Sequence, residues 1–293
     1  MLSNFPKTKF KKLASSERIE SDYQEKVSCF GTNLADRATP VKKMTKLHQR
    51  LRKIMEAGIR NFNLIESGDC VLVGISGGWD SLGLYRLLSD PLITTPNDFR
   101  RVAVHVDLGF QEKGERISTR LKELFEKTGH ELVVISTEIG PLVHSDYNRK
   151  NPCFLCSRLR RHEIYKMATR LGCNKIAYGH HKDDILETFL INVFFGRELS
   201  TMMPRQSIFS GKLHIIRPLV YIEEEMIKKF AQEQEFPLFT NPCPTAGHSK
   251  RAYIKALLKQ METDYPNVKK NVWRALFHPK PDYLFNPNLK AGV

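Results

Sequence analysis

The sequence lacks long apolar runs and has few cysteines. Its most hydrophobic segments are interrupted by charges within about ten positions, well short of the ~18 to 20 apolar residues that a membrane span needs. Six cysteines in 293 residues are too sparse for a disulfide scaffold, and no apolar signal peptide precedes them. We therefore expect a soluble, cytoplasmic protein that does not contact a membrane.

Two common motifs are also missing. The sequence has no G-x-x-x-x-G-K-S/T, so the usual phosphate-loop lysine is absent and transfer of a γ-phosphoryl group is disfavoured. There is one C-x-x-C, at Cys153 and Cys156, and no second pair to complete a four-cysteine zinc site.

Negative charge is scarce relative to positive charge. The chain has 46 Lys and Arg against 32 Asp and Glu, a formal charge of +14. This excess favours a polyanionic partner, and nucleic acid is the first to consider. The alternative is that the surplus only keeps the protein soluble. Charge does not separate RNA from DNA.

Composition and periodicity divide the chain into four parts. Residues 1–40 are polar and basic and indicate a loosely packed extension. Residues 41–66 have apolar residues at helical spacing among many lysines and arginines, so we expect an amphipathic helix whose basic face is either solvated or in contact with RNA. Residues 67–240 form the expected catalytic domain. Residues 241–293 form a C-terminal helical segment and tail carrying Cys243.

Five short apolar runs alternate with helical segments in the third part. They lie at residues 69–75, 101–106, 131–136, 175–179 and 213–217. This order predicts an α/β fold with a parallel five-stranded sheet and helices on both faces, and such sheets bind ligands at the carboxyl ends of their strands.

The first run leads directly into Ser76-Gly77-Gly78-Trp79-Asp80-Ser81, and a helical pattern follows. Consecutive glycines allow backbone NH groups to converge on an anion at a helix N-terminus. This segment therefore predicts a pyrophosphate site and chemistry at an α-phosphate. A plain turn in which Asp80 or Ser81 caps the helix is the alternative.

Three cysteines are candidate metal ligands. The Cys153–Cys156 pair alone is consistent with a metal site, a redox pair or chance. Cys243 is the natural third ligand, or else a small buried residue in a proline-flanked turn. Three thiolates on an iron-sulfur cluster would leave one iron open to bind sulfide.

Charged residues near these motifs are further candidates. Arg160 follows the cysteine pair on an expected helix, with Arg158, Arg161 and Lys166, and these residues either neutralise RNA phosphates or form a solvated face. Asp183 and Asp184 follow the fourth apolar run, where they can hold Mg²⁺, handle a proton or cap a helix.

Several motifs carry a resemblance to a known family. S-G-G-x-D-S after a strand resembles the PP-loop of the N-type ATP pyrophosphatases, which adenylate a substrate oxygen and release pyrophosphate. P-C-x-L-C-S-R-L-R-R at 152–161, G-H-H-K-D-D-I-L-E-T at 179–188, Phe-Phe-Gly at 194–196 and I-R-P-L at 216–219 resemble the TtcA-type tRNA 2-thiocytidine synthetases. The resemblance covers residues 68–251.

The resemblance implies a tRNA sulfurtransferase that uses ATP, Mg²⁺ and a 4Fe-4S cluster, with tRNA and a sulfur donor such as a cysteine desulfurase as partners, in a homodimer. It implies cluster ligation by Cys153, Cys156 and Cys243. Asp80, Arg160 and Asp184 are the expected catalytic residues. The expected ATP-binding residues are Ser76, Gly77, Gly78, Asp80, Ser81, His105, Asp107, Gly179, Asp183 and Asp184, with adenine near His105 to Asp107.

Two positions depart from the family pattern. Trp79 stands in the loop where lysine is common, and no second cysteine closely follows Cys243. The second departure leaves cytidine and uridine both open as the target base. A PP-loop ligase with structural zinc and a non-catalytic RNA-binding protein are the remaining alternatives.

Overall fold

The computed structural model describes residues 44–94, 96, 98–111, 115–145, 152–239, 243–245 and 249–284. All of them belong to one compact unit that begins at Lys42. The predicted basic extension, residues 1–40, lies outside the described residues.

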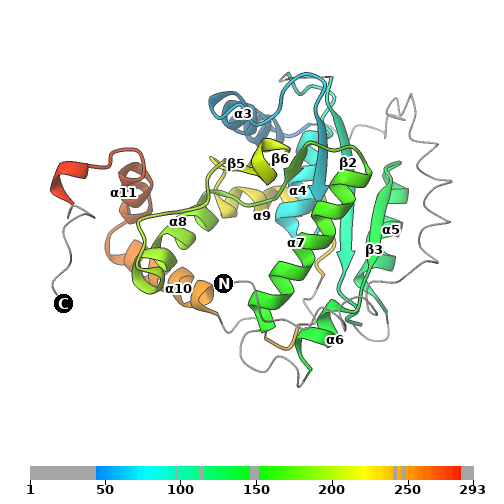
Figure 1. Ribbon diagram of the computed structural model, residues 1–293. Helices are drawn as coiled ribbons and strands as arrows, with labels where there is room; N and C mark the ends of the chain where they lie inside the picture. The colour runs from blue at the N-terminus through cyan, green and yellow to red at the C-terminus, as the bar shows by residue number, and fades with distance from the viewer. Residues whose placement is uncertain are drawn as a thin grey trace. The chain divides into compact units, whose positions relative to one another are not determined.

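A six-stranded sheet forms the centre of this unit (Figure 1). Its strands are β1 (Cys70–Gly74), β2 (Arg100–Asp107), β3 (Leu132–Ser136), β4 (Lys175–Ala177), β5 (Arg205–Ile208) and β6 (Leu213–Ile216). The order across the sheet is β3-β2-β1-β4-β6-β5. β1 pairs in parallel with β2 on one side and with β4 on the other.

The five predicted parallel strands are confirmed, but the predicted count of five was one too low. β5 pairs antiparallel with β6 at the sheet edge. None of its four residues, Arg-Gln-Ser-Ile, is fully buried. β5 therefore lacks the apolar run by which a buried strand is recognised in a sequence.

Helices precede, connect and follow the strands. They are α3 (Lys46–Asn61), α4 (Trp79–Leu88), α5 (Ile117–Lys127), α6 (Ile139–Val143), α7 (Pro152–Arg170), α8 (Lys182–Ile191), α9 (Glu224–Glu233), α10 (Lys250–Asp264) and α11 (Val268–Ala275). A π-helical turn, η3 (Asn192–Gly196), follows α8. Two short 3-10 turns are η4 (Phe209–Gly211) and η5 (Pro281–Tyr283). None of the helices in the described part combines the length and apolar character that crossing a membrane requires.

The amphipathic helix predicted within residues 41–66 is α3. The Thr45 hydroxyl caps its first turn by accepting a hydrogen bond from the His48 backbone N–H. Its apolar stripe, including Leu51, Met55 and Ile59, lies fully inside the main core together with residues of α4 and α9. Burial of the stripe leaves the basic face of α3 on the outside.

A second, smaller core joins α8, α10 and α11, which lie together in Figure 1. Leu186 of α8 packs against Ile254 and Leu258 of α10, and Trp273 of α11 packs on the same group. This core fixes the C-terminal helices to the segment that follows β4.

Candidate active site

The Ser76–Ser81 loop follows β1 and is closed by its own hydroxyl groups. The Ser81 Oγ accepts a hydrogen bond from the Ser76 backbone N–H at 3.1 Å and donates to the Gly78 carbonyl at 2.9 Å. The Ser76 Oγ accepts from the Gly78 backbone N–H at 3.2 Å. Gly77 has φ +88°, a conformation that side-chain-bearing residues rarely adopt. The loop therefore has a fixed shape at the start of α4.

Gly179, just after β4, presses against this loop. A Cβ atom at this position would lie 2.8 Å from the Asp80 carbonyl carbon and 2.9 Å from the Ser81 nitrogen. The connection after β4 and the start of α4 can approach so closely only because residue 179 has no side chain.

Asp80 and Asp184 meet around His181, and the three come from the loop after β1 and the segment after β4. The His181 Nε2 lies 3.8 Å from the Asp80 Oδ1 and 3.4 Å from the Asp184 Oδ2. Burial raises the pKa of Asp80, and the neighbouring Asp184 charge raises it further, while His181 opposes the rise. The structure thus brings together two of the three predicted catalytic residues.

Asp184 is also tied to the C-terminal helices. Its Oδ1 accepts a hydrogen bond from the Arg251 Nη1 at 2.7 Å. Its Oδ2 accepts from the His181 backbone N–H at 3.0 Å and forms a capping box at the start of α8.

Asp183 faces a different set of partners. Its Oδ2 accepts a hydrogen bond from the Glu224 backbone N–H at 2.8 Å, and its Oδ1 lies 3.2 Å from the Lys269 Nζ. These contacts join α8 to α9 and α11. A nucleotide-binding role for Asp183 stays a prediction, and its observed contacts are structural.

The predicted adenine region lies at the end of β2. The His105 Nδ1 lies 2.7 Å from the Ile75 carbonyl oxygen, just before the glycine loop. Asp107 accepts hydrogen bonds from the Ser118 Oγ at 2.6 Å and the Gly109 backbone N–H at 2.9 Å. Both side chains are buried and hold the surrounding loops in place.

The three predicted cysteine ligands converge. Cys153 and Cys156 lie in the first turns of α7, and the Thr245 Oγ1 lies 3.4 Å from the Cys153 Sγ and 3.3 Å from the Cys243 Sγ. The Cys153 and Cys243 sulfurs are thus no further apart than the sum of these distances. Cys156 lies one helical turn after Cys153 on α7, and burial raises the pKa of its thiol, with Cys243 and Cys153 adding to the rise.

The donor set of this group consists of three cysteine thiols. Within the described residues, no group of three or more His, Cys, Asp or Glu side chains is close enough to hold one metal ion. The Thr245 hydroxyl contacts the sulfurs of Cys153 and Cys243, and Cys156 lies one helical turn after Cys153. Cysteine thiolates are the ligands that hold iron-sulfur clusters, so the donor chemistry of this group fits such a cluster.

The other two described cysteines are remote from this group in the fold. Cys70 begins β1 and Cys173 precedes β4, at the amino ends of two paired parallel strands, and both are buried. They are structural residues of the core.

Arg160 lies on α7, one helical turn after Cys156. Its charge opposes the effect of burial on the pKa of Cys156. It also adds to the effect of burial in lowering the pKa of His105. Among its helix neighbours, Arg161 donates to the Ser157 Oγ at 2.8 Å and Lys166 pairs with Glu163 at 3.2 Å. A catalytic role for Arg160 stays a prediction.

Sequence reasoning assigned no role to a group of polar side chains at the ends of β4 and β6. The Tyr178 hydroxyl, the His180 Nδ1 and the Arg217 Nε are buried and have no hydrogen-bond partner among the described residues. Burial raises the pKa of Tyr178 and lowers that of His180 to about 4, so His180 is neutral at physiological pH. His180 and Arg217 lie in the family motifs at 179–188 and 216–219, and this was the signal in the sequence that could have identified them as site residues.

Trp79 also presents a buried donor. Its indole Nε1 has no hydrogen-bond partner among the described residues. The side chain that replaces the common lysine therefore keeps an unused N–H beside the glycine loop.

The sheet order and the glycine loop after β1 define a PP-loop domain, and the PP-loop domain family matches residues 43–261. The tRNA-cytidine(32) 2-sulfurtransferase of Actinobacillus succinogenes is 36% identical over 248 residues, which cover 84% of this chain and 78% of that protein. The protein of the same name from Nitrosospira multiformis is also 36% identical, over 83% of this chain and 82% of its own length. This chain belongs to the tRNA-cytidine(32) 2-sulfurtransferase family of PP-loop enzymes.

A solved structure shares the fold. The U34-tRNA thiolase NcsA from Methanococcus maripaludis, solved with its 4Fe-4S cluster, superposes with a TM-score of 0.62. The superposition covers 80% of this chain and 81% of that chain at 22% identity. At this identity the likeness shows a common fold.

Proposed function

We propose that this chain uses ATP to activate the 2-oxygen of a cytidine in the anticodon loop of tRNA and replaces that oxygen with sulfur. In this proposal a 4Fe-4S cluster is held by Cys153, Cys156 and Cys243. Family membership supports the class of reaction. The observation that carries the proposal is that the Thr245 hydroxyl contacts the sulfurs of both Cys153 and Cys243, although Cys243 lies far from Cys153 and Cys156 along the chain.

The activation step is assigned to the glycine loop. Backbone N–H groups of Ser76 to Ser81 and the N-terminus of α4 would bind the pyrophosphate part of ATP. The base oxygen attacks the α-phosphorus, pyrophosphate leaves, and the oxygen becomes part of a good leaving group. We assign Mg²⁺ to Asp80 and Asp184, because their carboxylates meet at this loop and Mg²⁺ prefers such oxygen ligands.

The exchange step is assigned to the region between the loop and α7. When bound, the cluster supplies an iron position not occupied by cysteine, at which sulfide can be held. Sulfide forms the new bond to carbon, the carbon–oxygen bond breaks, and oxygen leaves with AMP. Arg160 would stabilise the negative charge on the AMP phosphate, since it follows Cys156 by one helical turn and its positive charge acts on the pKa of both Cys156 and His105.

The proposal includes partners. tRNA is the substrate, a cysteine desulfurase or similar donor supplies sulfide, and the chain acts as a homodimer. A cytoplasmic setting belongs to it as well, because thiols that ligate iron must stay reduced.

The proposal is tested with anaerobic enzyme in which the cluster has been reconstituted. ATP, sulfide and unmodified tRNA are added, and tRNA nucleosides are analysed by mass spectrometry. We expect 2-thiocytidine from the wild type and none from Cys243→Ala. Cys70→Ala is the matched control, because Cys70 lies at the opposite end of the sheet, and it should retain the activity.

Other outcomes identify the alternatives. Thiouridine in place of thiocytidine would replace the proposed target base. Zinc without iron or labile sulfide in protein purified anaerobically would contradict the cluster. Absence of pyrophosphate release with tRNA and ATP would contradict catalysis by the loop.

A further inference from the structure

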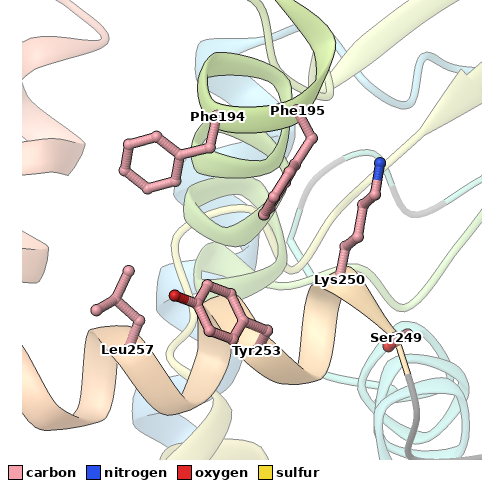
Figure 2. Close-up of a pocket in the computed structure, with 6 residues that line it drawn as sticks. All are labelled: Phe194, Phe195, Ser249, Lys250, Tyr253 and Leu257. Carbon is pink, nitrogen blue, oxygen red and sulfur yellow. The ribbon is translucent and has the colours of Figure 1, made fainter.

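A group of aromatic side chains lies exposed between η3 and the start of α10. Together with neighbouring residues they line an open hollow of about 620 Å³ (Figure 2). We refer to the side chains that line this hollow as the aromatic platform. Its lining residues are Phe194, Phe195, Ser249, Lys250, Tyr253 and Leu257.

The three aromatic rings are unusually open to solvent. Phe194 is 55% exposed, Phe195 43% and Tyr253 62%. Leaving rings of this size in water forgoes much of the free energy that their burial would supply. A contiguous exposed group of aromatic side chains therefore indicates a binding surface rather than a chance surface residue.

The rings are held in place. Phe195 packs edge-to-face against Phe194 and against Tyr253, in both cases with ring centroids 6.4 Å apart. Beneath them, buried Leu186, Ile254 and Leu258 join α8 to α10. The platform therefore presents its rings in a fixed arrangement, which lowers the entropy cost of binding a flat partner.

The platform is positively charged. The Lys250 Nζ lies 4.9 Å from the centroid of the Phe195 ring, and Figure 2 shows this amine standing beside that ring. The chain as a whole carries a formal charge of +14. Exposed aromatic rings beside a lysine are typical of surfaces that bind single-stranded nucleic acid, because bases stack on the rings and the amine neutralises a phosphate.

The platform adjoins the candidate active site. Lys250 precedes Arg251, whose guanidinium reaches Asp184 at 2.7 Å. Ser249 caps the start of α10 and follows the segment that carries Cys243 and Thr245. A nucleotide strand on the rings would therefore run beside the carboxylates of the site.

We propose that the aromatic platform stacks unpaired bases of the RNA loop that neighbour the target nucleotide, while Lys250 neutralises a phosphate between them. This inference rests on the proposed function for the identity of the RNA, and it adds the surface that holds the loop open. The rival occupant is a second copy of this chain. The lysine amine 4.9 Å from the centroid of the central ring favours a polyanion, because a positive charge at the rings complements a phosphate.

The test measures binding of an anticodon stem–loop RNA carrying 2-aminopurine in the loop, whose fluorescence falls when the base stacks. Phe194→Leu keeps an apolar side chain but removes the flat ring, and we expect about tenfold weaker binding together with loss of quenching. Phe194→Trp keeps a ring and should restore both.

Tyr283→Leu is the matched control. Tyr283 is 85% exposed and has the Lys280 Nζ 5.6 Å from its ring centroid, but it lies outside the platform. We expect its RNA affinity to stay within about twofold of the wild type. Lys250→Gln should lower the slope of log affinity against log salt by about one, whereas Phe194→Leu should leave that slope unchanged.

Unchanged RNA affinity in Phe194→Leu would overturn the proposal, as would an equal loss in Tyr283→Leu. Sedimentation tests the rival directly: conversion of a dimer to a monomer by Phe194→Leu, with RNA affinity intact, would make the surface a contact between copies. Thiolation is assayed separately. RNA that stacks on the platform without ever being thiolated would support this inference and contradict the proposed function.

Discussion

The glycine loop and the cysteine group differ in how they are held together. The loop is six consecutive residues whose hydroxyls and backbone satisfy one another, and Ser81 at its end is buried. The cysteine group joins the start of α7 to a distant segment through sulfur contacts of 3.3 to 3.5 Å with Thr245 and His144. Sulfur is a weak hydrogen-bonding partner. The loop is therefore held by hydrogen bonds between oxygen and nitrogen atoms within six residues, whereas weaker sulfur contacts link the distant parts of the cysteine group.

Iron removal should impair the function of the cysteine group and leave that of the glycine loop intact, and this is the largest difference that we expect. Chelation under anaerobic conditions should lower the thiolation rate by at least about a hundredfold, since metal ligation couples to local folding. ATP affinity, measured by calorimetry with Mg²⁺ in excess, should change by less than about twofold because the loop does not use the iron. A matching loss of ATP binding would mean that the two regions fold as one unit.

Two glycine substitutions test how tightly the loop region is packed. Gly179→Ala places a Cβ 2.8 Å from the Asp80 backbone, and we expect a loss of about 1–3 kcal/mol in the free energy of unfolding. Gly78→Ala is the matched control, since its Cβ meets only the Ser76 Oγ at 3.4 Å and φ is −73°. It should cost less than about 1 kcal/mol, for the poorer helix cap. Equal losses in urea unfolding would contradict the close approach of residue 179.

Glu187 of α8 has a buried carboxyl group, and it tests how closely the segment after β4 is packed. Burial, with the Asp184 charge adding to it, raises the pKa of Glu187 from 4.5 to about 7. The stability linked to its bound proton is therefore complete below pH 4.5 and is lost as pH rises through about 7. Because Gln does not ionise, the free energy of unfolding of Glu187→Gln should rise relative to that of the wild type by up to about 3 kcal/mol as the pH is raised from 4.5 to 8. Urea unfolding at both pH values checks this, and a pH-independent difference would contradict it.

The smallest effect concerns the hydroxyl between two of the sulfurs. Thr245→Val removes an oxygen 3.4 Å from the Cys153 Sγ and 3.3 Å from the Cys243 Sγ. We expect cluster reconstitution, followed by visible absorbance, to fall about two- to fivefold, as for loss of one modest hydrogen bond. Thr128→Val, at the end of α5, should reconstitute as the wild type does.

The contrast also explains what the sequence could predict. The loop after β1 was readable because its residues are adjacent and follow an apolar run, and the five parallel strands were readable because each is a short apolar run. Cys243 joins Cys153 only through folding of the intervening chain, so spacing left it ambiguous and the family resemblance supplied its role. The contacts of Asp183 depend on where α9 and α11 pack, which no local pattern encodes. The polar atoms of Tyr178, His180 and Arg217 that lack a hydrogen-bond partner among the described residues can be recognised only when their burial is known.

The order of the strands has one further consequence. Because β1 has β2 on one side and β4 on the other, the connections that leave β1 and β4 run in opposite directions across the sheet, and the segments beyond Gly74 and Ala177 meet where Gly179 contacts the Asp80 backbone. The position of the site at this meeting point arises from connectivity, not from the particular side chains that line it. Substitutions along its walls can therefore change which nucleobase is accepted without displacing the place where the reaction occurs.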